Sequence, residues 1–270
     1  MSEMIAVITT VRNGLPFLEE NLVSVDAQGA TERIHVVVDD GSTDGTAVWL
    51  SANWQTRVEL LLSAPIGRGR ALNIGWRAVE SEFVAILDAD DVASPVWLQE
   101  MLKVMGSHPQ IDVLGCRGVM AKEHVEDTPS DEVVPEILLA DRFLMMNPVH
   151  HSGVLIRRQA LAKVNGYDES RKSLFDYALW VDLLKSGACI ANLDRGYIFR
   201  RIHDRQHFES RKRIAYLKGC FGLRRRVSAS LLGGRGRLIP YLMFVYGLLP
   251  QDLRHWVRYW RRYCTTAGGG

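Results

Sequence analysis

The stretch IAVITTVRNGLPFLEENLVSVD, residues 5–26, predicts the first strand and helix of the fold. Residues 5–11 are apolar on both faces and rich in β-branched side chains, which is typical of a buried parallel strand. Leu18, Leu22 and Val25 then recur at helical spacing, after a turn and a proline that suits a first helical turn. This stretch therefore predicts a buried strand followed by a helix.

The same alternation of strand and helix recurs along the chain. Further strands are expected at residues 34–38, 58–62, 83–87, 113–116 and 154–156, and further helices at 43–50, 70–79, 95–105, 133–145 and 176–185. Strands that alternate with helices in this way form a mostly parallel sheet with helices on both faces. The sequence therefore predicts a three-layer α/β/α fold with a mostly parallel central sheet.

The net charge of +2 conceals an uneven distribution. Residues 200–262 hold 16 Lys and Arg against 3 Asp and Glu, a net charge of +13, whereas the other residues hold 17 against 28, a net charge of −11. From about residue 206 the composition shifts to arginine, aromatic residues and leucine. We therefore expect a basic helical C-terminal extension, whose partner can be an anionic lipid surface, an acidic partner or nucleic acid.

Two features of this extension favour a membrane surface. Its longest apolar run, residues 238–249, is shorter than the ~20 residues that a membrane-spanning helix needs. Trp256, Tyr259 and Trp260 lie among arginines, which suits a segment in a membrane interface. The alternative is a helical tail that forms an oligomer, and nucleic acid is not expected as a partner.

The four cysteines and the N-terminal residues indicate a reducing, cytoplasmic compartment. Cys116, Cys189, Cys220 and Cys264 lie far apart and form no CxxC pair, which argues against a zinc site and a disulfide framework. The apolar run near the N-terminus is too short for a signal peptide. We expect a cytoplasmic protein, peripheral on the inner face of the membrane if the extension binds lipid.

Three carboxylates follow the strand expected at residues 83–87, namely Asp88, Asp90 and Asp91. In open parallel sheets, ligands bind outside the carboxyl ends of the strands. Carboxylates this close repel one another unless a cation is present, and oxygen ligands favour Mg²⁺ or Mn²⁺, which often shares its shell with substrate phosphates. The alternative is a solvated acidic turn in which Asp90 or Asp91 caps the helix that begins near Pro95.

The segment VVVDDGSTDG, residues 36–45, forms a second candidate site. A carboxylate at a strand end can accept hydrogen bonds from ribose hydroxyls or a base N–H, so Asp39 or Asp40 would bind a nucleoside. The same residues can also build a turn and a helix cap around Gly41. Since the chain has no GxGxxG after its first strand and no P-loop lysine motif, nicotinamide and ATPase functions are disfavoured.

Several ordered segments resemble the family 2 glycosyltransferases and their A-type fold. They are Thr9-Thr10 with Asn13, VVDDGSTDGT (37–46), GRGRALNIG (67–75), FVAILDADD (83–91), NPVHHSGVLIRR (147–158), NGYD (165–168) and FDYALW (175–180). Together they span roughly residues 4–205. Ordered segments over this length are a far more specific signal than one short motif.

The resemblance implies a role for each matching residue. The nucleotide-binding residues would be Thr9, Asp39, Asp40, Asn73, Asp88 and Asp90, and the ligands of Mg²⁺ or Mn²⁺ would be Asp90 and Asp91. Asp176 matches the aspartate of the family's Glu-Asp-Tyr segment, the expected general base. This chain departs from the family by having Phe175 in place of the glutamate.

A further set of side chains could contact the acceptor or a phosphate. These are Arg70, His150, His151, Trp180 and His203. Each has a structural alternative, namely an exposed arginine, a histidine satisfied within the protein, or a core tryptophan.

These features predict an inverting, metal-dependent glycosyltransferase. It would move a sugar from a nucleoside diphosphate sugar, which the resemblance implies to be UDP-linked, to a hydroxyl of a cell-envelope or lipid-linked glycan. Residues 1–205 would form the catalytic domain, 206–264 the basic tail and 265–270 a disordered end. The alternatives are a catalytically impaired binder of nucleotide or of a membrane partner, and a sugar-phosphate nucleotidyltransferase. The latter is disfavoured because the loop after the first strand offers only one arginine and one glycine.

Overall fold

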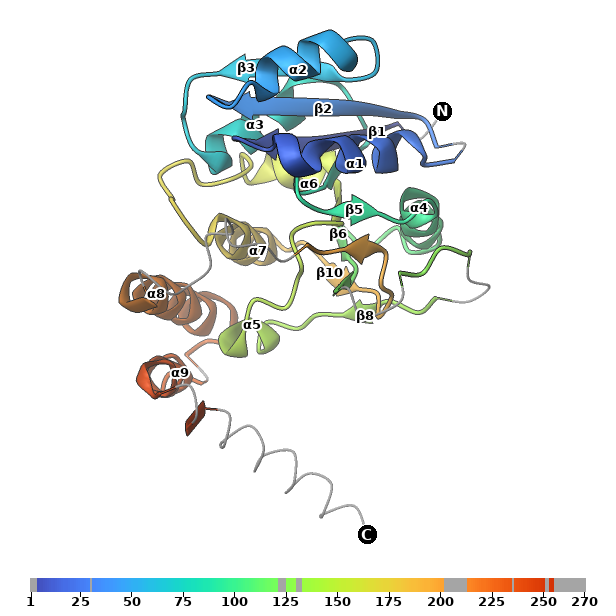
Figure 1. The fold of residues 1–270 in the computed structure, drawn as a ribbon. Coiled ribbons are helices and arrows are strands. Elements are labelled where there is room, and N and C mark those ends of the chain that lie inside the picture. Colours follow the sequence, from blue (N-terminus) through green and yellow to red (C-terminus); the bar gives the residue numbers. More distant parts are fainter. Residues whose placement is uncertain are drawn as a thin grey trace. The chain divides into compact units, whose positions relative to one another are not determined.

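A computed structural model describes residues 4–29, 31–120, 125–129, 133–201, 213–234, 236–250 and 253–254. The chain separates into two compact units. Residues 1–139 and 147–206 make up the first, here called the sheet unit, and residues 140–146 and 207–270 make up the second, the helical unit. Figure 1 shows the elements of both units along the chain.

The sheet unit is built on an eight-stranded sheet among the described residues, with the order β3-β2-β1-β4-β9-β6-β10-β8. The strands are β1 (Ile5–Val11), β2 (Arg33–Asp40), β3 (Glu59–Ser63), β4 (Phe83–Ile86), β6 (Val113–Gly115), β8 (Glu136–Ile137), β9 (Leu155–Arg157) and β10 (Ile190–Asn192). The strands β1 to β4 pair in parallel, as do β6 and β10. Strand β9 runs antiparallel to both its neighbours, and β8 is antiparallel to β10. The predicted mostly parallel sheet is confirmed.

Helices cover both faces of this sheet (Figure 1). They are α1 (Leu15–Asp26), α2 (Thr46–Asn53), α3 (Arg68–Ala78), α4 (Trp97–Ser107), α6 (Arg158–Lys163) and α7 (Phe175–Lys185). Leu22 of α1 and Leu50 of α2 share a buried cluster with Val37 of β2. Helix α3 packs on the opposite face, where a Cβ at Gly75 would lie 2.6 Å from Ile8 Cγ2 and 3.2 Å from Val38 Cγ2. Since successive strand residues point to opposite faces, the predicted three layers are confirmed.

A small second sheet follows the acidic turn directly. It consists of β5 (Val92–Ala93), β11 (Ile198–Phe199) and β7 (Gly118–Val119), in the order β5-β11-β7. Ser94 N–H also donates a hydrogen bond to Tyr197 O over 2.8 Å. These pairings fix the backbone immediately after Asp91.

The helical unit contains α5 (Arg142–Met145), α8 (Arg213–Leu231) and α9 (Ile239–Leu248). Helices α8 and α9 confirm a helical C-terminal region. The predicted boundary at residue 205 stays a prediction because residues 202–212 lie outside the described residues, as do 255–270 with Trp256, Tyr259 and Trp260. Among the helices that are described, none combines the length and apolarity required to cross a bilayer.

The helix expected at residues 133–145 was wrong over most of its length. Residues 136–137 form β8, which pairs with Ala191 and Asn192 of β10, and only Arg142–Met145 are helical. Pro135 lies inside the expected helix, where its ring and missing N–H disrupt helical hydrogen bonding.

Candidate active site

The carboxyl ends of β1, β2 and β4 lie at one edge of the sheet. The parallel register pairs Val11 with Asp39 and Ile8 with Ile86. Parallel strands present their carboxyl ends at the same edge, so the residues after β2 and β4 reach one region. This register brings the segment around Asp40 and the segment beginning at Asp88 to that edge.

The acidic turn of Asp88 to Asp91 is held by buried hydrogen bonds. Asn21, which is fully buried on α1, donates from Nδ2 to Asp88 O over 2.9 Å and to Asp91 O over 3.0 Å. Asp91 N–H donates to Asp88 O over 2.9 Å, and Asp88 N–H donates to Ser152 Oγ over 3.1 Å. Because the backbone is fixed, the three side chains of the turn are held together, with one carboxylate oxygen of Asp88, Asp90 and Asp91 each within 4.8 Å of the others.

Arg68 and His151 surround the carboxylate of Asp88. Arg68 Nη2 forms an ion pair with Asp88 Oδ1, and His151 Nδ1 lies 3.5 Å from the same oxygen. Burial by itself would raise the pKa of Asp88, but the Arg68 guanidinium and the His151 hydrogen bond hold that pKa well below its usual range. Asp88 therefore stays ionised despite its burial.

Asp91 has the opposite environment. Its pKa is raised to about 7, first by burial and then by the negative charge of Asp88. A buried carboxylate beside other carboxylates is stabilised in its charged form by a cation, and three oxygen donors suit Mg²⁺ or Mn²⁺. The acidic turn therefore fits a divalent metal.

The loop before α3 connects the two acidic segments of the edge. Asp40 Oδ1 accepts hydrogen bonds from Ile66 N–H at 2.7 Å and Gly67 N–H at 3.2 Å, and its Oδ2 lies 3.1 Å from Gly67 N. Gly41 has φ +74°, and a Cβ there would lie 2.7 Å from Pro65 Cδ, so this close approach requires glycine. Asp40 thus anchors the loop whose next residue, Arg68, reaches Asp88.

Two of the predicted nucleotide-binding residues, Asp39 and Thr9, form hydrogen bonds within the protein. Asp39 Oδ1 accepts from Ser42 N–H over 2.7 Å. The Thr9 hydroxyl is fully buried, donates to Leu87 O over 3.0 Å and lies 2.9 Å from His35 Nε2.

The amide of Asn73 is used completely. Its Nδ2 donates to Tyr167 O and Glu169 Oε1, both over 2.9 Å, and its Oδ1 accepts from Tyr167 N–H over 2.9 Å and Trp76 Nε1 over 3.0 Å. The side chains of Asn73 and Thr9 therefore hold the scaffold beneath the edge, and their contact with a nucleoside stays a prediction.

Asp176 lies in the first turn of α7, and Asn147 Nδ2 donates to its Oδ2 over 2.7 Å. The residue before the helix, Leu174, has φ +57°, a conformation that costs a non-glycine residue about 1–3 kcal/mol. Phe175 lies in a cluster of rings, with its centroid 5.5 Å from that of His151. The start of α7 is thus held against the residues that contact Asp88.

The guanidinium of Arg68 marks the point where the acidic side chains converge. Burial lowers the pKa of Arg68, but Asp88, Asp90 and Asp176 together more than offset burial and raise it. Arg68 Cζ also lies 5.3 Å from the centre of the Phe175 ring. Asp88, Asp90 and Asp176 therefore all lie near enough to the Arg68 guanidinium for their charges to act on it.

The predicted acceptor contacts occupy different environments. His150 Nδ1 lies 2.7 Å from Ser152 O, and its pKa is lowered to about 4, chiefly by burial and then by Arg200. His151 lies between Asp88 and Tyr167, whose hydroxyl is 2.9 Å from Nε2.

The remaining predicted contacts are further from the acidic turn or outside the described chain. Trp180 is fully buried with its ring centroid 6.3 Å from that of His151, so it supports that histidine from the core instead of offering a surface to an acceptor. Arg70 forms an exposed ion pair with Glu169 over 3.2 Å. His203 lies outside the described residues.

Sequence reasoning missed the residues that hold the acids in place. Asn21, Asn147 and Ser152 act through one or two hydrogen bonds to distant segments, and no spacing within the sequence marks such contacts. Asn147 and Ser152 do belong to the segment NPVHHSGVLIRR, which carried part of the resemblance.

Comparison with solved structures supports the fold. The chain is similar to residues 1–349 of TarS from S. aureus in complex with UDP-GlcNAc, with a TM-score of 0.67 and 22% identity, covering 87% of this chain and 68% of that TarS 1–349 chain. It is also similar to the mannosyltransferase PcManGT from Pyrobaculum calidifontis in complex with GDP-Man and Mn²⁺, with a TM-score of 0.63 and 18% identity, covering 95% of this chain and 83% of that protein.

Sequence comparison identifies the family. The chain is 26% identical over 179 residues to the amylovoran biosynthesis glycosyltransferase AmsE of Erwinia amylovora, covering 65% of this chain and 67% of AmsE. It is 24% identical over 223 residues to an uncharacterized glycosyltransferase of Haemophilus influenzae, covering 75% of this chain and 67% of that protein. The family model described as glycosyl transferase family 2 matches residues 6–164, which include both acidic segments of the sheet edge. The chain therefore belongs to glycosyl transferase family 2.

Proposed function

We propose that this protein is an inverting glycosyltransferase that takes its sugar from a nucleoside diphosphate sugar, with UDP as the first nucleotide to test. The observation that carries the proposal is the acidic turn, in which one carboxylate oxygen each of Asp88, Asp90 and Asp91 lies within 4.8 Å of the others and Asp88 forms an ion pair with Arg68. Acidic side chains at the carboxyl edge of a parallel sheet can bind a nucleotide and a divalent metal together. The solved structures with UDP-GlcNAc and with GDP-Man and Mn²⁺ support this class of donor.

The residues of the acidic turn have distinct roles in this proposal. Asp90 and Asp91 would hold Mg²⁺ or Mn²⁺, which when bound neutralises negative charge on the leaving diphosphate. A carboxylate offers about four acceptor sites, so Asp40 can bind the loop before α3 and still accept a hydrogen bond from the nucleoside. Asp39 supports the same turn through Ser42.

Asp176 acts as the general base in this mechanism. Its Oδ2 accepts the hydrogen bond from Asn147, so we assign Oδ1 to the acceptor hydroxyl, whose proton it would take as the oxygen attacks the anomeric carbon. A single displacement with one base inverts the configuration at that carbon, whereas a hydrolase of the retaining type needs a second carboxylate. The acceptor would be a hydroxyl of a cell-envelope or lipid-linked glycan.

A donor screen tests the proposal. The purified protein is incubated with Mn²⁺ and a panel of UDP- and GDP-linked sugars, and the release of nucleoside diphosphate is measured. We expect turnover with at least one donor, and Asp176→Asn to lower it by about 10²-fold or more while UDP binding is retained. Asp194→Asn, a change at a side chain that is 90% exposed, is the matched control.

Two results would contradict this assignment. Unchanged activity of Asp176→Asn would remove Asp176 as the base. If the wild type binds UDP but turns over no donor, the protein is better described as a catalytically impaired nucleotide binder. That alternative is motivated by Phe175, which stands where the family has a glutamate.

A further inference from the structure

The helical unit exposes a continuous apolar face on α9. Leu238, Tyr241, Leu242, Val245 and Leu248 recur at helical spacing, and each is between 50 and 73% exposed. The opposite side of the helix is packed, since Pro240 and Gly247 are buried and a Cβ at Gly247 would lie 2.4 Å from Leu217 Cδ2. Helix α9 therefore has one face against α8 and one apolar face toward the outside of the unit.

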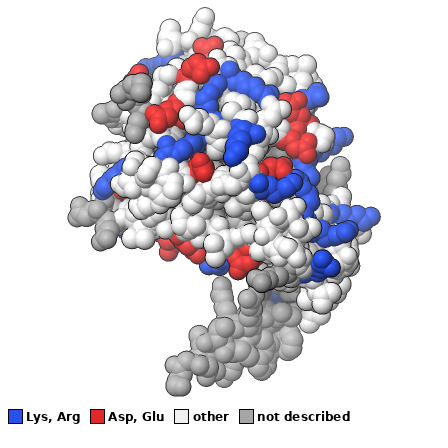
Figure 2. All heavy atoms as spheres, turned by 180° about the vertical axis from the view of Figure 1, so that it is seen from behind, with Lys and Arg blue, Asp and Glu red and all other residues white. Residues whose placement is uncertain are grey.

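Basic side chains border this face. Phe221 of α8 packs against Tyr241 with ring centroids 5.0 Å apart, and Arg225 Cζ lies 5.8 Å from the Phe221 ring. Lys218 precedes Phe221 by one helical turn, so Lys218 and Arg225 lie on either side of it. Both cations are exposed, and Figure 2 shows several Lys and Arg side chains on the surface over α8.

The charge of this region has one sign. Residues 213–250 contain seven Lys and Arg and no Asp or Glu. Two of the arginines serve the unit itself: Arg224 is buried and donates to Met145 O over 3.0 Å, and Arg213 donates to Leu249 O over 2.6 Å at the end of α9. Lys218, Arg225 and Arg237 are exposed and remain for a partner.

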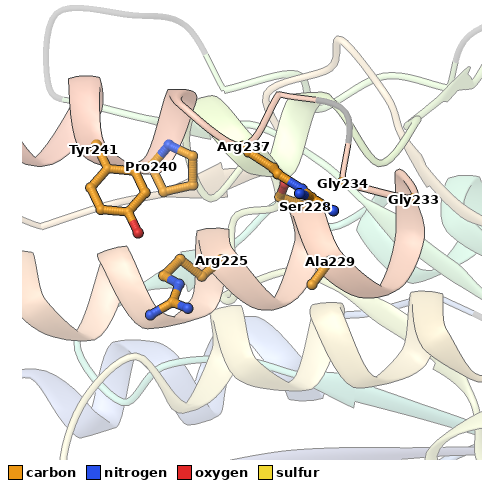
Figure 3. Close-up of a pocket in the computed structure, with 8 residues that line it drawn as sticks. All are labelled: Arg225, Ser228, Ala229, Gly233, Gly234, Arg237, Pro240 and Tyr241. Atoms are coloured by element: carbon orange, nitrogen blue, oxygen red, sulfur yellow. The ribbon is translucent and has the colours of Figure 1, made fainter.

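A hollow of about 610 Å³ lies between α8, the loop after it and the start of α9. Figure 3 shows Arg225 extending from α8, the Tyr241 hydroxyl directed toward α8, and Arg237 beside Gly234. A Cβ at Gly234 would lie 2.4 Å from Arg237 Nε, so glycine at this position leaves room for the guanidinium. Two arginines, which Figure 3 shows apart from each other, and a tyrosine thus line the hollow next to the apolar face, and each guanidinium can contact a phosphate group on its own.

We propose that the α8–α9 hairpin docks on the surface of an anionic lipid bilayer. The apolar face of α9 enters the boundary between head groups and acyl chains, and Lys218, Arg225 and Arg237 contact lipid phosphates, with the hollow receiving a head group. The ten residues of α9 span about 15 Å, half the hydrocarbon thickness of about 30 Å, so the helix lies in the interface.

Other partners match this surface less well. A second copy would bring another hairpin with only positive charges against the first, and the two would repel. Nucleic acid would satisfy the cations, but it offers no apolar phase for Leu242, Val245 and Leu248. An anionic bilayer satisfies both the charges and the apolar face.

Vesicle flotation with the full chain tests this inference. The wild type is mixed with vesicles of equal parts phosphatidylcholine and phosphatidylglycerol, or of phosphatidylcholine alone. We expect binding to the anionic vesicles only, weakened by added salt. Arg225→Gln/Arg237→Gln should bind about thirtyfold more weakly, because each cation near the surface contributes about a factor of five. Leu242→Ser/Val245→Ser should weaken binding by roughly tenfold or more.

Matched variants in the sheet unit serve as controls. Arg57→Gln/Arg117→Gln removes two arginines that are 58% and 52% exposed, and Val48→Ser/Leu62→Ser removes two exposed apolar side chains. Both should bind vesicles as the wild type does, and circular dichroism verifies that every variant is folded.

Several results would overturn the inference. These are equal flotation with both kinds of vesicle, no flotation with anionic vesicles, or wild-type flotation of either hairpin variant. If the protein binds no vesicles but forms a dimer that Leu242→Ser/Val245→Ser disrupts, the apolar face belongs to a contact with a second copy. If it binds no vesicles but binds RNA tightly and in a salt-sensitive way, the face belongs to a contact with nucleic acid. Because the test reads vesicle binding, its failure leaves the proposed sugar transfer unaffected.

Discussion

Asn21 provides the sharpest test of how the acidic turn is built. Its buried amide donates to the carbonyl oxygens of Asp88 and Asp91 over 2.9 and 3.0 Å. Replacing it with alanine leaves both carbonyls without these donors in a fully buried site. Asp91 O loses its donor, at about 1–3 kcal/mol, whereas Asp88 O keeps the hydrogen bond from Asp91 N–H and loses only its second donor, at about 1 kcal/mol, so Asn21→Ala should lower the free energy of unfolding by about 3 kcal/mol.

Urea denaturation of the metal-free protein, followed by circular dichroism, measures this change. Asn53→Ala is the matched control, because the Asn53 amide also donates to a backbone carbonyl, that of Trp49 over 2.8 Å, but is exposed on α2. An exposed substitution of this kind should change the free energy of unfolding by no more than about 0.5 kcal/mol.

A small effect would refute the reasoning. If Asn21→Ala and Asn53→Ala unfold at the same urea concentration, the two hydrogen bonds to the turn do not stabilise it. The carboxylates of Asp88, Asp90 and Asp91 would then owe their placement to the small sheet that follows them.

Three further predictions follow from other contacts. Burial lowers the pKa of His35 from 6.5 to about 3, so the folded protein favours the neutral imidazole. The free energy of unfolding should therefore fall as the pH drops from about 6.5 toward 3, by up to about 1.4 kcal/mol per pH unit. His35→Gln should lose this part of the pH dependence, which urea unfolding at several pH values measures. Gly75→Ala should lower the free energy of unfolding by about 1–3 kcal/mol, because the added Cβ would overpack α3 on β1. Gly106→Ala, whose Cβ would meet open space, should raise the free energy of unfolding by up to about 1 kcal/mol. An equal response of the two variants would contradict the packing of α3. Asn147→Ala, which frees Asp176, should lower kcat roughly tenfold with little change in the donor KM, and an unchanged kcat would argue against a positioning role.

The first half of the fold could be predicted because its strands are buried on both faces. Such strands appear as continuous apolar runs, and the runs at residues 5–11 and 83–87 match β1 and β4 closely. The rule that ligands bind at the carboxyl ends then placed Asp40 and Asp88 at one edge without any coordinates.

The less regular second half shows where local patterns fail. Strand β8 has only two residues and exists through its pairing with β10, more than fifty positions away. Apolar residues around it have no strand-like run, so the periodicity favoured a helix despite Pro135. Short edge strands of this kind depend on distant partners, which local spacing does not encode.

Phe175 illustrates how a departure from a family pattern can be interpreted once the contacts are known. A glutamate at this position would add a negative charge beside Arg68, whose guanidinium lies 5.3 Å from the Phe175 ring centre, and would compete with Asp88 for it. The phenyl ring instead offers its face, which attracts the cation without neutralising it. The carboxylates that raise the pKa of Arg68 are therefore those of Asp88, Asp90 and Asp176. We infer that the substitution preserves the pairing at Asp88, so the loss of the glutamate does not by itself argue against catalysis by Asp176.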